Sequence, residues 1–124
     1  MEFIKRHEKG RRFSRATVHN GTAYFSGLTA SNLVGDIVAQ TREVLEKADT
    51  LLAAVGSDRT KLLHAMIWLR DIDDFAGMNL VWEEWIDADH PPARATVESR
   101  LAAPDILVEI QFTVAVGHEV IAQD

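Results

Sequence analysis

The chain has 124 residues, of which 47% are hydrophobic and 26% are charged. This is an ordinary globular composition, so we expect a single domain over residues 1–124 rather than a disordered or fibrous chain. Cysteine is absent and the formal net charge is -6, which excludes disulfides, thiolate catalysis and thiolate metal sites and disfavours binding to the phosphates of nucleic acids.

Membrane and export segments are not indicated. No apolar run reaches the roughly 18 residues of a membrane-spanning helix, and residues 1–6 contain no apolar core of a secretory signal. We therefore expect a cytoplasmic protein with no membrane partner.

The first fifteen residues are basic, with six Lys or Arg and two Glu. Such a segment can contact RNA, but we favour a solvated edge strand whose cations discourage pairing with another chain. An additional strand over residues 3–7 would fit this interpretation.

Asn20-Gly21 predicts a two-residue turn of type I′. We expect a hairpin with strands over residues 14–19 and 22–26. The second strand ends in Ser26-Gly27, where glycine would allow close approach of the backbone to a ligand or would simply form a bend.

A helical period follows from Asp36, which can cap the helix, to Gly56, which can end it. Residues 61–70 then alternate as a strand that is covered on both faces. Residues 71–86 predict a second helix, and we expect its aromatic stripe to pack in the core.

Residues 94–101 and 106–116 both alternate, and residues 102–105 could form the turn of a second hairpin. Antiparallel pairing would then place Arg94 and Thr96 on the same face as Glu109. The simplest register sets Glu98 opposite Glu109, an unfavourable pair that a bulge, another register or Arg100 would relieve.

These elements predict an α+β fold in the order β-β-α-β-α-β-β, a mixed β-sheet with two helices packed on one face. The other face would carry polar and apolar side chains together, among them Met66, Trp68 and Glu109. A surface of that size favours burial against further subunits, so we expect a homo-oligomer.

Motifs for nucleotide binding, serine hydrolysis and metal binding are absent, so we expect no cofactor and no metal. Arg94 and Glu109 remain as candidates. The arginine fork can hold a small carboxylic acid, and a carboxylate can activate water to hydrolyse an adjacent C=N bond. From spacing alone, a structural ion pair at a subunit interface is the favoured alternative.

Several segments resemble the RidA/YjgF/UK114 family of enamine and imine deaminases, in the same order along nearly the whole chain. They are residues 24–27, 54–56, 69–75 and 92–97, together with Asn79, Arg100, Ala102 and residues 108–110. The resemblance implies a chorismate-mutase-like (YjgF) fold and a homotrimer with ligand sites between subunits.

The resemblance also implies residue roles. Arg94 would bind the carboxylate of a 2-imino acid and Glu109 would position water, giving a 2-oxo acid and ammonia. The cleft would be lined by Phe13, Ser26, Gly27 and Thr96. The chain departs from the family pattern at three positions that bear on substrate range, which are Phe13, Leu28 and Thr96 in place of Tyr, Gln and Cys.

Two other functions stay open within this family. One is non-catalytic binding of small carboxylates as a sensor or inhibitor. The other is a ribonuclease that acts on translation, for which we find no basic and aromatic surface outside the N-terminal segment.

Overall fold

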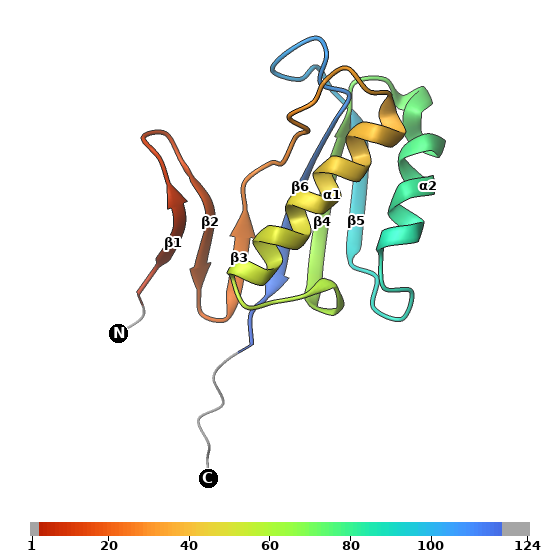
Figure 1. The fold of residues 1–124 in the computed structure, drawn as a ribbon. Helices are drawn as coiled ribbons and strands as arrows, with labels where there is room; N and C mark the ends of the chain where they lie inside the picture. The colour runs from red at the N-terminus through yellow and green to blue at the C-terminus, as the bar shows by residue number, and fades with distance from the viewer. Residues whose placement is uncertain (1–2, 118–124) are drawn as a thin grey trace.

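The computed structural model describes residues 3–117, which form a six-stranded mixed sheet with two helices on one face (Figure 1). The strands are β1 (Lys5–Lys9), β2 (Ser14–His19), β3 (Thr22–Phe25), β4 (Leu62–Leu69), β5 (Ala93–Glu98) and β6 (Val108–Ala115). The helices are α1 (Ile37–Ala54) and α2 (Phe75–Trp85), with short 3₁₀ segments at Arg59–Lys61 and Ile72–Asp74. The predicted α+β architecture is confirmed, and β1 is the additional N-terminal strand.

The first hairpin forms as the sequence predicts. Asn20 and Gly21 have φ values of 54° and 77°, the conformation that a type I′ turn requires. The turn joins β2 to β3 in antiparallel register, and β1 pairs with the outer side of β2. In Figure 1 this part of the sheet extends beyond the two helices.

Helix α1 begins and ends at the predicted residues. The side chain of Asp36 caps the helix by accepting from the N–H of Ala39 at 3.0 Å, and Gly56 follows the helix with a φ of 78°. The buried face of α1 covers the centre of the sheet with Val44, Leu45, Ala48, Leu51 and Leu52.

Helix α2 begins four residues later than the sequence pattern suggests. Asp71 instead caps the preceding 3₁₀ segment by accepting from the N–H of Asp73 at 2.9 Å. The predicted aromatic stripe does pack in the core, where the Trp82 ring is stacked on Phe112 with centroids 6.0 Å apart. Phe75 is the exception, because 42% of it is exposed.

The predicted hairpin between β5 and β6 is wrong. The sheet order is β1-β2-β3-β6-β4-β5, so that β4 lies between them. Strand β5 is parallel to β4, because α2 provides a crossover long enough to return the chain in the same direction. The proposed clash between glutamates therefore does not arise, since Glu98 lies beside Leu69 and Glu109 beside Trp68.

This topology also overturns the prediction that Arg94 and Glu109 share a face. Ala65 of β4 has Arg94 on one side and Phe112 on the other, so Arg94 lies on the face that the helices cover. Glu109 is paired with Trp68 on the opposite face.

The face without helices carries a mixed set of side chains. Across it lie Thr17, Tyr24, Thr113 and His64 in one row, and Gln111 with Met66 in the next. Tyr24 is 50% exposed and His64 is also exposed. None of the helices within residues 3–117 combines the length and hydrophobicity needed to cross a membrane.

Candidate functional site

The candidate residues form two groups on opposite faces of the sheet. We call Arg94, Thr96 and Asn79 the arginine half-site, and Glu109, Gly27 and Ser26 the glutamate half-site.

The arginine half-site lies between β5 and α2. Arg94 Nη1 donates to Asn79 Oδ1 at 2.8 Å. The guanidinium lies 5.2 Å from the centroid of the Trp82 ring and 5.8 Å from that of Phe75. These aromatic and amide contacts hold the arginine plane in one orientation.

Arg94 is partly buried but is not neutralised by a carboxylate within the described residues, as is typical of an arginine that binds an anionic ligand. Burial lowers the pKa of Arg94, and the nearby charge of Glu83 partly opposes this effect. Within residues 3–117 no carboxylate forms an ion pair with Arg94, which leaves donors of its fork for a ligand. Within one chain Arg94 and Glu109 do not pair, because they lie on opposite faces of the sheet.

Thr96 is the next residue of β5 on the same face as Arg94. Its Oγ1 atom is buried and has no hydrogen-bond partner in the described part of the chain. A buried hydroxyl without a hydrogen-bond partner destabilises the folded protein unless another molecule supplies that partner.

The glutamate half-site lies where β3 ends beside β6. A Cβ atom added at Gly27 would come within 2.8 Å of the Glu109 carboxyl carbon, so the carboxylate rests directly on the glycine backbone. Leu28 then forms a two-way backbone bridge with Ile110, with N–O distances of 2.8 Å and 3.1 Å. Gly27 is therefore required for close approach, and the simple-bend interpretation is insufficient.

The environment of Glu109 favours its protonated form. Burial raises the pKa of Glu109, and no described residue donates a hydrogen bond to its carboxylate. Ser26, which precedes Gly27, also has a buried Oγ without a partner among residues 3–117. The half-site thus contains a carboxyl group that can take up and release a proton, together with a hydroxyl that has no partner among residues 3–117.

Phe13, the remaining candidate, lies in the loop between β1 and β2 and is 56% exposed. The guanidinium of Arg15 lies 5.4 Å from the centroid of its ring. The Ser26 N–H donates to Arg15 O at 2.9 Å, so this end of β2 adjoins the glutamate half-site.

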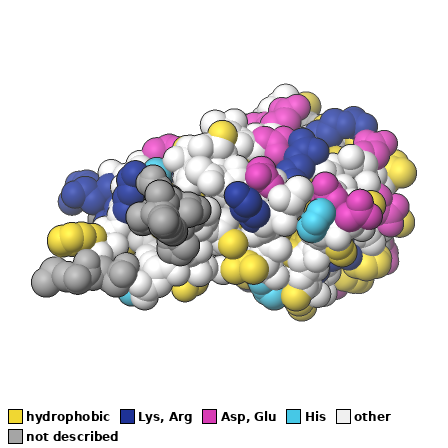
Figure 2. Space-filling view, turned by 90° about the horizontal axis from the view of Figure 1, so that it is seen from below, with side chains coloured by type: hydrophobic (Ala, Val, Ile, Leu, Met, Phe, Trp, Pro, Cys, Tyr) yellow, Lys and Arg dark blue, Asp and Glu magenta, His cyan; other side chains and the backbone are white. Residues whose placement is uncertain are grey.

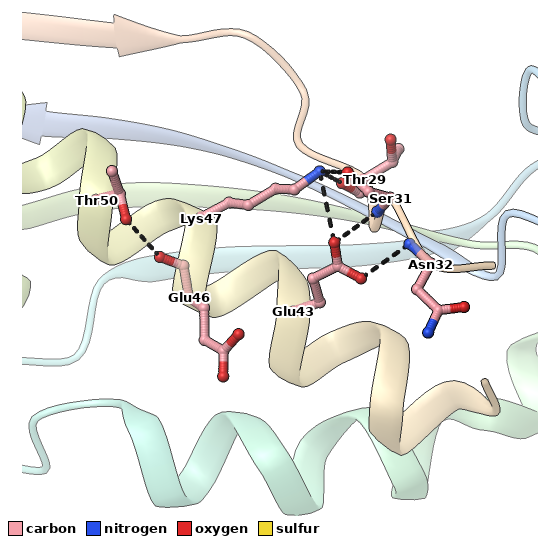
Figure 3. Close-up of polar contacts among 7 residues, drawn as sticks. All are labelled: Thr29, Ser31, Asn32, Glu43, Glu46, Lys47 and Thr50. Carbon is pink, nitrogen blue, oxygen red and sulfur yellow. Dashed lines mark hydrogen bonds and ion pairs between the residues drawn. The ribbon is translucent and has the colours of Figure 1, made fainter. Parts of the chain in front are cut away.

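Helix α1 holds the segment that follows Gly27 (Figure 3). Glu43 accepts from the N–H groups of Ser31 and Asn32 at 2.7 Å and 3.0 Å, and these bonds lower the pKa of Glu43. Lys47 Nζ donates to Thr29 O at 2.8 Å and to Ser31 Oγ at 2.7 Å. The two side chains fix the path of the loop as it leaves the half-site.

A buried glutamine connects this loop to the start of β6. Gln40 is 1% exposed, and its amide nitrogen donates to Gly35 O at 3.2 Å and to Asp105 O at 3.0 Å. Its oxygen accepts from the N–H of Leu107 at 3.0 Å. Gln40 therefore ties together the two chain segments that carry Gly27 and Glu109.

No sequence pattern assigned a site role to Asn79, Gln40, Glu43 or Lys47. The position of Asn79 on α2 could have indicated its role, because it shares a helix face with Phe75 and Trp82 at spacings of four and three. The loop contacts depend on tertiary structure and had no sequence signal. Among the described residues, no group of three His, Asp or Glu side chains is placed to hold a metal ion.

Comparisons with known proteins agree over almost the whole chain. The family model described as Endoribonuclease L-PSP matches residues 4–116. A RutC family protein from Haemophilus influenzae is 44% identical over 100 residues, which cover 80% of this chain and 86% of the relative.

Solved structures give the same result. An uncharacterized protein from Pseudomonas aeruginosa has a TM-score of 0.90 at 37% identity, covering 93% of this chain and 100% of that one. NMB1025, a YjgF family member from Neisseria meningitidis, has a TM-score of 0.89 at 41% identity, with 94% and 97% covered. The chain therefore belongs to the RidA/YjgF family, whose model carries the description Endoribonuclease L-PSP.

Proposed function

We propose that this protein hydrolyses reactive 2-imino acids, and the enamines that give rise to them, to 2-oxo acids and ammonia. The observation that carries this proposal is a pair of complementary groups that each lack a charged partner. Arg94 is half-buried without a carboxylate, and Glu109 is half-buried without a donor, within the described residues.

Because the two half-sites lie on opposite faces, one chain alone does not bring these groups to a single substrate. We propose that a homotrimer places the arginine half-site of one subunit against the glutamate half-site of the next. The mixed surface of the sheet supports this assembly, since Tyr24 and other exposed groups would be covered there.

In this arrangement Arg94 binds the substrate carboxylate through its remaining donors, and Asn79 and the aromatic rings keep the guanidinium oriented. Thr96 Oγ1 and Ser26 Oγ, which have no hydrogen-bond partner among residues 3–117, can bond to the bound substrate or to water. An enamine such as 2-aminoacrylate first takes up a proton at its terminal carbon and releases one from its nitrogen, which gives the imine.

Glu109 acts as the proton relay. It accepts a proton from water as the water oxygen bonds to the imine carbon, and it returns that proton to the nitrogen. The hydroxyl of the resulting adduct then passes its proton to the nitrogen through Glu109. The C–N bond breaks, ammonia leaves and the carbonyl forms. The raised pKa of Glu109 suits both proton transfers.

Replacement of Arg94 tests this proposal. We expect Arg94→Ala to lower kcat/KM for freshly generated 2-iminopropanoate on the order of 100-fold, because the carboxylate loses its charged hydrogen bonds. Release of ammonia and 2-oxo acid is the measurement, with circular dichroism to verify folding. Arg42→Ala is the matched control, since Arg42 is an exposed arginine in a surface pair with Glu84.

Two results would replace the proposal with another function. Saturable binding of 2-oxo acids without turnover of any imine would indicate a sensor. RNA cleavage that remains after removal of contaminating nucleases and disappears in Glu109→Gln would support the activity that the family model's description names.

A further inference from the structure

The β1–β2 hairpin is the most cationic part of a chain that is otherwise acidic. Figure 2 shows Lys and Arg side chains at the end of the molecule where β1 and β2 lie, while most of the acidic side chains visible there lie toward the other end. The formal net charge of -6 would repel a substrate with two carboxylates. The cations of the β1–β2 hairpin make the local electrostatic potential positive and so attract such a substrate there.

These cations line a cavity. A cavity of about 560 Å³ lies beside the hairpin and is lined by Glu8, Gly10, Arg11, Arg12, Phe13 and Arg15. The three arginines form no ion pair with any carboxylate of residues 3–117. The cavity therefore presents three arginines and an aromatic ring against a single carboxylate, that of Glu8, which forms no ion pair with them.

Protection of a sheet edge does not account for Arg15. Edge protection explains cations on β1, the outermost strand, such as Lys5 and Arg6. Arg15 belongs to β2, which is paired on both sides, and its side chain is half-buried over Phe13. A different role is needed for this residue.

The cavity adjoins the glutamate half-site. Arg15 is the cross-strand neighbour of Ser26, whose N–H donates to Arg15 O at 2.9 Å. Ser26 is followed by Gly27, which supports the Glu109 carboxylate. A substrate whose reacting carbon lies at Glu109 can thus direct its side chain toward Arg15 and Phe13.

We propose that the preferred substrates are 2-imino dicarboxylates, such as the imines derived from aspartate and glutamate, and that Arg15 is the residue that selects them. Arg94 binds the carboxylate next to the imine, and Arg15 binds the one at the end of the side chain. Arg11 and Arg12 add to the attractive field, and the Phe13 ring orients the Arg15 guanidinium. This inference rests on the proposed function.

The test compares kcat/KM for the imines of glutamate and alanine, each generated in place by an amino-acid oxidase with semicarbazide as a competing trap. We expect the parent to favour the glutamate imine, and Arg15→Gln to lower the glutamate-to-alanine ratio about tenfold or more. Arg6→Gln is the matched control. It removes one positive charge from the same hairpin but does not line the cavity, and it should keep the parent's ratio.

The outcomes separate the two proposals. Preference of the parent for the alanine imine, an unchanged ratio in Arg15→Gln, or an equal fall in Arg6→Gln would overturn the inference and leave the proposed deaminase function intact. If the parent hydrolyses neither imine, the proposed function fails.

Calorimetric titration of Glu109→Gln with 2-oxoglutarate and with 2-oxobutanoate then decides the selectivity without turnover. Tighter binding of 2-oxoglutarate that is lost on further Arg15→Gln substitution would support the dicarboxylate site. Equal affinity for the two acids would refute it.

Discussion

At the scale of single residues, the contact between Gly27 and Glu109 is the most exacting feature of the structure. A hydrogen at the α-carbon leaves room for the carboxylate, whereas a methyl group would overlap it. The glutamate side chain can rotate away at little cost, because the crowded atoms are the end of a flexible chain. A substitution of Gly27 should therefore affect catalytic activity more than the free energy of unfolding.

We expect Gly27→Ala to lower kcat/KM on the order of 100-fold, because it displaces the proton relay, while the melting temperature stays near that of the parent. Imine hydrolysis and thermal unfolding are the two measurements. Gly117→Ala is the control, since the nearest atom to its added Cβ is Lys61 Nζ at 3.5 Å. Full activity in Gly27→Ala would contradict the assigned position of Glu109.

The raised pKa of Glu109 predicts a pH dependence of stability. The folded chain binds this proton more tightly than the unfolded chain, so the stabilisation is complete below the unfolded pKa and is lost as pH rises through the folded pKa. The free energy of unfolding of Glu109→Gln should therefore increase relative to that of the parent as pH rises above about 4, the ordinary pKa of a glutamate.

Urea denaturation across this pH range measures the difference. Glu98→Gln, a substitution of an exposed glutamate at the end of β5, is the matched control. A difference between parent and Glu109→Gln that is constant with pH would show that burial does not perturb this carboxyl.

At the scale of elements, helix α1 organises the loops around the glutamate half-site. Glu43, Lys47 and Gln40 lie along it and hold the loop after β3, and Gln40 also holds the start of β6. The helix thus supports catalysis through the loops that it anchors rather than through contact with substrate.

We expect Gln40→Leu to lower the free energy of unfolding by about 1–3 kcal/mol, because the Leu107 N–H and several carbonyl groups lose a buried partner. The neighbouring substitution Thr41→Val is the control. Thr41 is equally buried, but its hydroxyl has no partner in the described residues, so its removal should change stability by less than about 1 kcal/mol. Urea unfolding that ranks Thr41→Val as the more harmful change would refute this account.

Local sequence patterns predicted the positions of the strands along the chain but not their order in the sheet. The alternation of residues 106–116 located β6 well, yet its neighbours in the sheet were assigned incorrectly. Strands that are adjacent in sequence usually pair, and that rule favoured a hairpin with β5. The helical crossover instead placed β5 beside β4 and turned Arg94 toward the helices.

For the whole molecule, the two half-sites lie on opposite faces of the sheet, so each active site would need two subunits. Two variants that are damaged in different half-sites should therefore restore activity when they assemble together. Arg94→Ala and Glu109→Ala should each retain very little activity alone. When equal amounts are unfolded and refolded together, random assembly of trimers would restore about a quarter of the sites, because Arg94 comes from one subunit and Glu109 from the next.

The measurement is hydrolysis by the mixed sample relative to refolded parent, with size-exclusion chromatography and light scattering for the subunit number. As a control for assembly, the double variant Arg94→Ala/Glu109→Ala is refolded with Arg42→Ala, which should behave like the parent. In this mixture two damaged subunits cannot complement each other. If the mixture of single variants forms trimers but stays inactive, the proposal that Arg94 of one subunit and Glu109 of the next act on the same substrate is wrong.

Several properties of this protein follow from the sequence alone. Alternation, helical spacing, the Asn20-Gly21 turn and the Asp36 cap depend on neighbours within a few residues, so they could be read directly and agree with the structure. The family resemblance likewise required only the order of residues along the chain.

Only the tertiary structure decided which face each candidate occupies. The order of strands in a sheet depends on long-range pairing, and this order placed Arg94 against α2 and Glu109 against Gly27. The same is true of burial, which raises the pKa of Glu109 and lowers that of Arg94. Residues distant in sequence create these environments when they pack, so local sequence patterns contain no direct signal for them.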